Sequence, residues 1–231
     1  MNKEFSYSYG DYYHKDKFAR MRFDIVFSIL TEFMNEGVKV LDIGCYDGAM
    51  LEILKKGTEK IDYIGVDGDE LALEIAQLKG ARVMNINFEF EKLPFEHNYF
   101  DMVIMGEMLE HLRDPSQLMT QAKDMVKPNG VVLISLPNEC TVYHRFKMLL
   151  GKGIDGMGFQ PGYHMHFPTL QQNKEFVSRY FKIIKEEYWY HLGVGGFAEK
   201  IIDKIPAKVI KFLVKTWPAL FARGVIYLCQ K

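Results

Sequence analysis

The run VLDIGCYDG at residues 40–48 constrains the fold more than any other part of the chain. Residues 38–43 are mostly apolar and predict a short buried strand, which a glycine turn and an amphipathic stretch follow. A strand, a glycine turn and a helix form the first half of a nucleotide-binding α/β unit. Gly44 and Gly48 let the backbone approach a ligand closely, and free N–H groups of the helix that follows point toward it. Asp42 adds a negative charge at the end of the strand, which suits a cationic ligand better than a pyrophosphate.

Strand and helix signals alternate along the rest of the chain. The apolar runs predict strands at residues 38–43, 63–66, 82–86, 100–105, 131–136, 181–192 and 224–230. Helical periodicity and capping signals predict helices at residues 18–36, 49–56, 69–79, 115–126 and 170–179. Asp114 and Pro115 are typical of an N-cap and a first helical position, and Thr169 is typical of another cap. We therefore expect an α/β fold with a doubly wound, mostly parallel seven-stranded sheet that ends in an antiparallel edge pair.

Length and charge favour one globular domain over residues 1–231. A chain of 231 residues can bury a sizeable core, and its formal net charge of −1 provides no basic field that would attract nucleic acid. The three cysteines are widely separated and show no metal or disulfide spacing, so we expect a reducing cytoplasm. The first residues carry no apolar segment typical of a signal peptide, and no apolar stretch is long enough to span a bilayer.

Asp67 follows the second predicted strand, about 20 residues after the last glycine of the turn. Because ligands bind such sheets at the carboxyl ends of the strands, this carboxylate is a candidate acceptor for both hydroxyls of a ribose. The alternative is an N-cap for the helix that starts at Asp69. The ribose role fits several adenosine cofactors equally well.

The first motif resembles motif I of the class I S-adenosylmethionine (SAM) methyltransferases, which has the form D/E-x-G-x-G-x-G. Here the positions are Asp42, Gly44, Tyr46 and Gly48, so a tyrosine replaces the middle glycine. A dinucleotide-binding dehydrogenase is the rival interpretation of this motif alone.

A second block at residues 89–115, EFEKLPFEHNYFDMVIMGEMLEHLRDP, resembles the methyltransferases and not the dehydrogenases. It matches the pattern D-x-x-x-LPF followed by FD-x-V and E-H-L-x-D-P, with Glu89 in the acidic position. The resemblance implies a SAM site in which Glu89 and Phe90 meet the adenine and Asp67 holds the ribose. It also implies cofactor contacts from Gly68, Met105 and Glu107.

The segment Glu107-Met108-Leu109-Glu110-His111 is the candidate catalytic element. On one helical turn Glu107, Glu110 and His111 would share a face, where two carboxylates and an imidazole can hold a divalent cation. The string is similar to that of ubiquinone-pathway O-methyltransferases and of small-RNA 2′-O-methyltransferases, whose motif binds Mg²⁺ with a later histidine. We choose His166 over His164 for that position. The alternatives are metal-free general-base catalysis by His111, assisted by Glu110, and a purely structural histidine.

Two insertions interrupt the alternating pattern. Residues 137–168 are rich in glycine and histidine and follow the fifth strand, so we expect a lid beside the cofactor. Residues 197–223 carry a broad apolar face and six basic against two acidic side chains. This helical insertion has four alternative interpretations. It would act as a substrate cap or a dimer surface, pack as a helix pair with solvated lysines, or contact an anionic membrane or a lipid-linked substrate.

The sequence therefore predicts a SAM-dependent methyltransferase that acts on a hydroxyl oxygen of a small molecule. A sugar, a quinone precursor and a lipid-linked intermediate are the candidate acceptors. A SAM-binding module that acts through a partner protein, an RNA 2′-O-methyltransferase and an NAD-dependent dehydrogenase are the alternatives.

Overall fold

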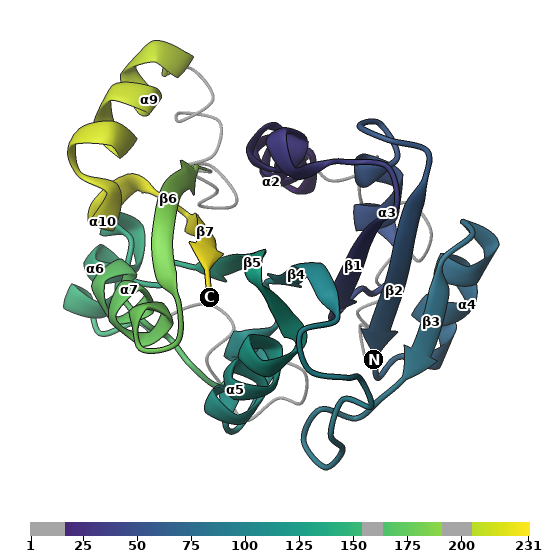
Figure 1. Cartoon of the computed structure of the whole chain (residues 1–231). Coiled ribbons are helices and arrows are strands. Elements are labelled where there is room, and N and C mark those ends of the chain that lie inside the picture. Colours follow the sequence, from purple (N-terminus) through teal and green to yellow (C-terminus); the bar gives the residue numbers. More distant parts are fainter. Residues whose placement is uncertain (1–16, 154–163, 191–204) are drawn as a thin grey trace.

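The computed structural model describes residues 17–153, 164–190 and 205–231, and its strands form one seven-stranded sheet (Figure 1). The spatial order is β3 (Arg82–Asn85), β2 (Ile61–Asp67), β1 (Val38–Ile43), β4 (Phe100–Gly106), β5 (Val126–Pro137), β7 (Gly224–Gln230) and β6 (Lys182–Trp189). The strands from β3 to β5 are parallel, whereas β7 runs antiparallel to both β5 and β6. The predicted fold class and the antiparallel strands at the edge are confirmed.

Helices cover both faces of the sheet. They are α2 (Lys17–Leu30), α3 (Ala49–Leu54), α4 (Glu70–Leu78), α5 (Pro115–Met125), α6 (Val142–Leu149), α7 (Leu170–Ser178), α9 (Ala207–Thr216) and α10 (Pro218–Phe221), with short 3₁₀ turns η1 (Thr31–Phe33) and η2 (Leu109–His111). Asp114 and Thr169 cap α5 and α7 as expected, and Thr169 forms a complete capping box with Gln172.

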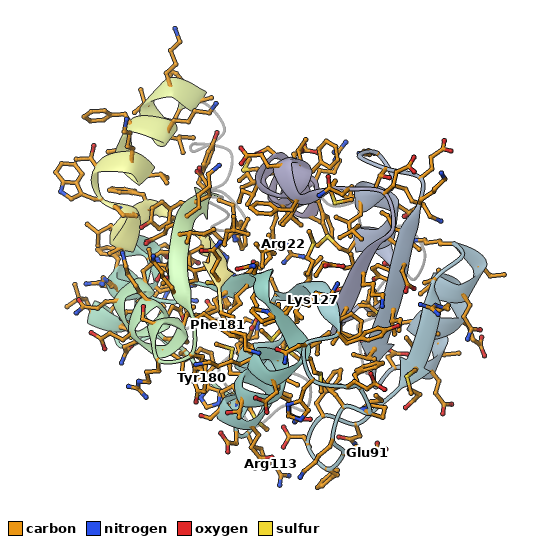
Figure 2. All side chains as sticks on the ribbon, viewed as in Figure 1. Arg22, Glu91, Arg113, Lys127, Tyr180 and Phe181 are labelled. Atoms are coloured by element: carbon orange, nitrogen blue, oxygen red, sulfur yellow. The ribbon has the colours of Figure 1, made fainter. Side chains whose placement is uncertain are left out.

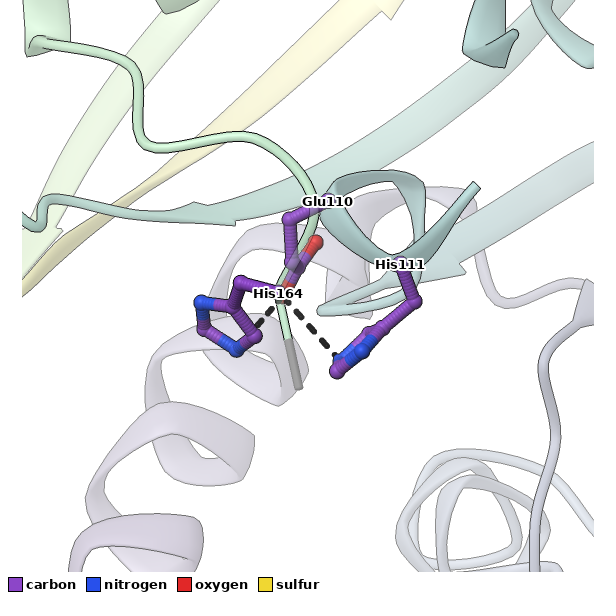
Figure 3. A group of neighbouring side chains, drawn as sticks. All are labelled: Glu110, His111 and His164. Carbon is purple, nitrogen blue, oxygen red and sulfur yellow. Dashed lines mark ion pairs between the residues drawn. The ribbon is translucent and has the colours of Figure 1, made fainter. Parts of the chain in front are cut away.

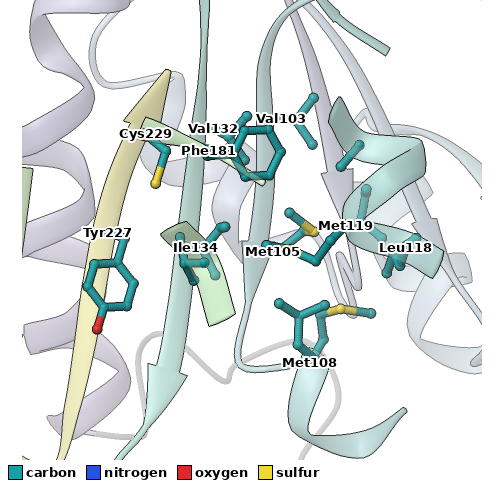
Figure 4. Packing of buried hydrophobic residues seen from close by; sticks show 14 of the residues in the cluster. Val103, Met105, Met108, Leu118, Met119, Val132, Ile134, Phe181, Tyr227 and Cys229 are labelled. Carbon is teal, nitrogen blue, oxygen red and sulfur yellow. The ribbon is translucent and has the colours of Figure 1, made fainter. Parts of the chain in front are cut away.

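The strand period of two divides the core into two clusters. Along β4, Met102 and Ile104 pack against α2 and α3, while Val103 and Met105 pack on the opposite face with α5 and α7. Figure 4 shows this second cluster, in which Met119 of α5 and Phe181 lie beside strand side chains. Buried strands of this kind read as nearly continuous apolar runs, which is why the sequence predicted them well.

The start of β5 departs most from its prediction, whereas β6 ends at Trp189 and residues 191–192 of its predicted range lie outside the described part of the chain. β5 begins at Val126 and not at residue 131, so the Lys-Pro-Asn-Gly segment at residues 127–130 lies inside the strand. The pairing shifts register between Phe100 and Met102, and a Cβ on Gly130 would lie 2.8 Å from the Asp101 carbonyl oxygen. This irregularity lets a proline and a glycine, which usually interrupt strands, stay within the sheet.

The two insertions are partly helical. Residues 142–149 of the first form α6, and residues 154–163 lie outside the described part of the chain. In the second insertion, α9 and α10 occupy residues 207–221, while residues 197–204 are outside the description.

The strand order fixes where a ligand binds. The chain moves from β1 outward to β3 and then returns to β4 on the other side of β1. In open α/β sheets, ligands bind at the carboxyl ends of the strands where the winding direction reverses, here between β1 and β4.

Candidate active site

A cavity of about 700 Å³ opens at the carboxyl ends of the central strands. Eight of the predicted site residues line it, namely Asp42, Gly44, Tyr46, Asp67, Gly68, Glu107, Glu110 and His111. Five others are not in its wall, namely Gly48, Glu89, Phe90, Met105 and His166. The volume lies in the usual range for cofactor sites.

The turn after β1 takes three left-handed residues in alternate positions. Gly44, Tyr46 and Gly48 have φ angles of +77°, +47° and +73°. Tyr46 thus adopts a conformation that normally favours glycine, so the backbone keeps its path without the middle glycine of motif I. Gly48 serves the packing of α4, because a Cβ there would come within 3.0 Å of the Ala76 Cβ.

Asp42 is buried at the end of β1, where the Tyr63 hydroxyl donates a hydrogen bond of 2.5 Å to its Oδ2. Burial and, to a smaller extent, the nearby Asp67 raise the pKa of Asp42 to about 7, against the opposing effect of the Tyr63 hydrogen bond. Because burial destabilises the ionised form of this carboxylate, a cation that enters the cavity and pairs with it stabilises that form.

Asp67 ends β2, and both of its oxygens face backbone donors. The Tyr46 N–H donates to Oδ2 at 2.9 Å, and the Asp69 N–H donates to Oδ1 at 3.0 Å. Burial raises the pKa of Asp67, against the effect of these hydrogen bonds. Asp69 itself caps α4 by accepting from the Ala72 N–H, so Asp67 does not have the N-cap role that was its alternative.

The predicted adenine pair lies outside the cavity wall. Glu89 Oε1 accepts a hydrogen bond of 2.8 Å from the Arg113 N–H, and Phe90 is 78% exposed. The neighbouring Phe88 lines the cavity instead. Met105 is likewise buried in the core, and the following Gly106 takes a place in the wall.

Glu107 leaves the expected helical turn because its φ angle is +53°. Its N–H donates to the Ser135 carbonyl oxygen, which extends the pairing of β4 with β5 by one residue. Its carboxylate accepts from the Ser135 hydroxyl at 2.5 Å and lies 3.7 Å from the Arg22 guanidinium. Glu107 therefore faces α2, and the helical face predicted for Glu107, Glu110 and His111 does not form.

Glu110 lies between two histidines (Figure 3). Its Oε1 is 4.0 Å from His111 Nε2 and 3.9 Å from His164 Nε2. The side chain is buried, and neither carboxylate oxygen has a hydrogen-bond partner among the described residues. Burial and the nearby Glu107 raise the pKa of Glu110 well above its usual range. Ligand atoms of the three residues lie within 4.8 Å of one another, as in a metal-binding group.

The loop histidine in this cluster is His164 and not His166, the residue chosen from the sequence. The N–H groups of Met165 and His166 both donate to the Glu110 carbonyl oxygen, which fixes the loop against η2. The His166 Nε2 then lies 2.8 Å from the Leu112 carbonyl oxygen, directed away from the Glu110 carboxylate. The structure thus places His164 where a third ligand would be.

Further residues in or beside the cavity were not singled out from the sequence. Arg22 and Trp189 line it, and Glu139 bonds His164 just behind it. Glu139 follows β5, where residues after a strand end are expected near the ligand, so its position was a usable signal. Arg22 belongs to a helix that precedes the sheet, and no local pattern marks it.

The comparison with known families decides the identity. A family described as a methyltransferase domain matches residues 14–180, which is most of the chain. The chain belongs to the class I SAM-dependent methyltransferases.

Curated methyltransferases share part of this sequence. The ubiquinone biosynthesis O-methyltransferase of Acinetobacter baylyi is 32% identical over 108 residues, which cover 44% of this chain and 44% of that protein. The protein of the same description from Acinetobacter baumannii strain ACICU is 32% identical over 108 residues, 44% of this chain and 45% of its own. The chain spans less than half the length of these relatives.

Solved structures, two of them of methyltransferases, share the fold. A SAM-dependent methyltransferase from Archaeoglobus fulgidus superimposes with a TM-score of 0.58 at 20% identity, over 92% of this chain and 96% of that one. Phosphoethanolamine N-methyltransferase 2 of Haemonchus contortus, solved with SAM, superimposes with a TM-score of 0.59 at 20% identity, over 90% of this chain and 52% of that one. The [4+2]-cyclase SpnF superimposes with a TM-score of 0.60 at 16% identity, over 90% of this chain and 81% of that one. The fold alone therefore does not define the reaction of this methyltransferase.

The cavity of this methyltransferase fits SAM. The buried carboxylate of Asp42 and the half-buried carboxylate of Asp67 complement a cationic ligand that carries ribose hydroxyls. Gly106 leaves open space in the wall, because a Cβ there would meet nothing within 4 Å.

Proposed function

We propose that this methyltransferase transfers the methyl group of SAM to a hydroxyl oxygen of a small molecule, such as a sugar, a quinone precursor or a lipid-linked intermediate. The observation that carries the proposal is the buried Glu110 carboxylate between His111 and His164 in the cavity wall. An acceptor hydroxyl must lose its proton as it attacks, and an imidazole or carboxylate is the usual group that takes it. The partial likeness to ubiquinone O-methyltransferases supports oxygen as the acceptor atom.

Within the cofactor site, each side chain has a proposed task. Asp42 pairs with the ammonium group of SAM, Asp67 accepts from the ribose hydroxyls, and Phe88 packs on the adenine. The adenine role moves from Glu89 and Phe90 to Phe88 because Phe88 lines the cavity. Holding the methyl carbon in line with the attacking oxygen supplies much of the acceleration.

Glu110, His111 and His164 would together hold a divalent cation. Two imidazoles and one carboxylate suit Mn²⁺ or Zn²⁺ better than Mg²⁺, which prefers oxygen ligands. A bound cation of this kind would lower the pKa of the acceptor hydroxyl. Glu107, expected to be a fourth ligand, is directed to Ser135 and Arg22, so the proposed set omits it.

The test is methyl transfer from labelled SAM to a panel of catechols, sugars, amines, thiols and RNA. We expect turnover on hydroxyl acceptors, and a loss of about 100-fold or more in Glu110→Gln and in His111→Ala with SAM binding retained. His97→Ala is the matched control, because His97 is exposed and away from the cavity.

Other results would redirect the proposal. Transfer only to amines or to RNA would contradict the small-molecule O-methyltransferase. SAM binding without turnover on any acceptor would favour a non-catalytic SAM-binding module. Turnover that resists chelators and does not respond to Mn²⁺, Zn²⁺ or Mg²⁺ would leave His111 as the metal-free base.

A further inference from the structure

Two helical segments without acidic residues emerge at the same corner of the sheet. One is residues 140–153, which follow β5 and include α6, and the other is residues 205–223, which include α9 and α10 and precede β7. They meet because Pro137 pairs with Gly224 in the antiparallel register of β5 and β7. We call the exposed side chains of these two segments the α6–α9 surface.

The side chain of Asn138 joins the two segments. Its Nδ2 donates to the Ala222 carbonyl oxygen at 2.8 Å and to the Ala219 carbonyl oxygen at 3.3 Å. The Asn138 N–H also donates to the Arg223 carbonyl oxygen. α6 and α10 are therefore anchored to one point of the fold.

The α6–α9 surface exposes an unusual share of apolar side chains. Of the fourteen large apolar side chains exposed within the described residues, eight belong to it, namely Val142, Phe146, Met148, Leu149, Leu150, Val209, Phe212 and Trp217. Leu149 is 84% exposed and Phe212 is 63% exposed. Figure 2 shows the side chains of α9 extending outward from the body of the protein. Exposed apolar groups gathered in this way mark an interaction site.

The charges on this surface are all positive. Six basic side chains accompany the apolar ones, namely the exposed Arg145, Lys152, Lys208, Lys211 and Lys215 and the half-buried Lys147. The remaining cation of the two segments, Arg223, is directed to Glu139 at 3.3 Å and lines the cavity. The surface is thus strongly basic although the whole chain carries a net charge of −1.

We propose that the α6–α9 surface docks on a lipid bilayer that contains anionic headgroups. Helices with aromatic and leucine side chains beside lysines lie in the headgroup region, where the apolar groups enter and the ammonium groups meet phosphates. Lysine is depleted in protein–protein interfaces, so the five lysines among the apolar side chains favour lipid over a protein partner or a second copy. Among the described helices none has the length and apolar character to cross a bilayer, so the contact is interfacial.

Docking of this kind places the cavity at the membrane. Glu139 and Arg223 lie at the bases of the two segments, and Arg223 is part of the cavity wall. A lipid-embedded acceptor could then reach the cavity from the bilayer. The docking itself does not depend on which atom is methylated.

The experiment is sedimentation of the whole protein with phosphatidylcholine vesicles, with or without phosphatidylglycerol. We expect binding only when phosphatidylglycerol is present and weaker binding at high salt. The double variant Lys211→Glu/Lys215→Glu should weaken partitioning by roughly tenfold or more, since each basic residue near an anionic surface contributes appreciably. Leu149→Ser and Phe212→Ser should weaken it because they remove apolar groups that enter the headgroup region.

Matched controls separate docking from general changes. Leu78→Ser removes an equally exposed leucine, 88% exposed on α4, which packs beside β3 at the other edge of the sheet (Figure 1). Lys92→Glu reverses an exposed lysine outside the surface. Both controls should bind as the unaltered protein does. Equal binding to neutral vesicles, or no binding to either kind, would overturn the proposal. A dimer in sedimentation that the Leu149 and Phe212 variants dissociate would overturn it too.

Discussion

Glu139 Oε1 lies 3.0 Å from His164 Nδ1, and this contact orients the imidazole whose Nε2 faces Glu110. Burial alone would raise the pKa of Glu139, but the His164 hydrogen bond and the nearby Arg223 hold it below its usual range. Glu139 is therefore a carboxylate that keeps the Nδ1 proton of His164 in place. Carboxylates of this kind commonly support metal-binding histidines.

Glu139→Ala is expected to lower the affinity for Mn²⁺ or Zn²⁺ by about tenfold or more, because His164 loses the partner that fixes its orientation. Calorimetric titration of the metal-free protein measures the change. Glu175→Ala provides the control, since Glu175 is exposed on α7 and accepts its hydrogen bond from Gln171 of the same helix, outside the proposed metal site. An unchanged affinity in Glu139→Ala would show that His164 is no ligand.

SAM binding is expected to depend on pH through Asp42. The pKa of Asp42 is raised from 3.8 to about 7 by burial, so the unliganded protein binds a proton there that a cationic ligand must displace. Affinity for SAM should therefore rise by up to roughly tenfold per pH unit as the pH increases from 6 toward 7. Above the pKa of Asp42 the affinity should level off. Titration of SAM across this range measures the slope, which Asp42→Asn should abolish.

Tyr63→Phe gives a sharper form of the same prediction. The Tyr63 hydrogen bond lowers the pKa of Asp42, so its removal should move the midpoint of the SAM profile to higher pH. A midpoint that stays in place, or moves to lower pH, would contradict the assignment. Without ligand, the raised pKa of Asp42 makes the free energy of unfolding decrease as the pH rises from 3.8 to about 7. In this range the folded protein still binds the Asp42 proton, whereas the unfolded chain has already released it.

The sequence predicted the strands because their information is local. Val38–Ile43 is mostly apolar and largely buried, so its boundaries appear in the sequence as they do in the sheet. The cap at Asp114 and the capping box at Thr169 are equally local, since the partner groups lie within three residues. In each case the deciding contacts lie close together in the sequence.

The candidate site was harder to predict because tertiary contacts decide it. His164 and His166 differ only in which ring faces Glu110, and backbone hydrogen bonds to the Glu110 carbonyl make that choice. Glu107 was assigned to a helical turn, but its pairing with Ser135 of another strand and a left-handed φ turn it away. No periodicity in the sequence encodes such contacts.

Gly106→Ala is expected to weaken SAM binding by about tenfold while leaving stability within roughly 0.5 kcal/mol. The added Cβ meets nothing within 4 Å in the protein, so it occupies space in the cavity wall and not in the core. Thermal unfolding with and without SAM separates the two effects. Gly44→Ala should instead destabilise the protein itself, because its φ is +77° and its Cβ would lie 3.0 Å from Met108. Equal SAM affinity in Gly106→Ala would place the cofactor away from this wall.

Gly224→Ala is expected to destabilise the fold by about 1–3 kcal/mol. Gly224 pairs with Trp189 across β7 and β6, and an added Cβ would overlap the indole ring. The ring is buried, so it has little room to move aside. Urea unfolding followed by tryptophan fluorescence measures the loss, and Gly153→Ala is the control because its Cβ would meet no atom within 4 Å. In a Trp189→Ala background the cost of Gly224→Ala should vanish, since the overlap has been removed. A cost that persists there would assign the effect to the backbone of β7 and not to the indole.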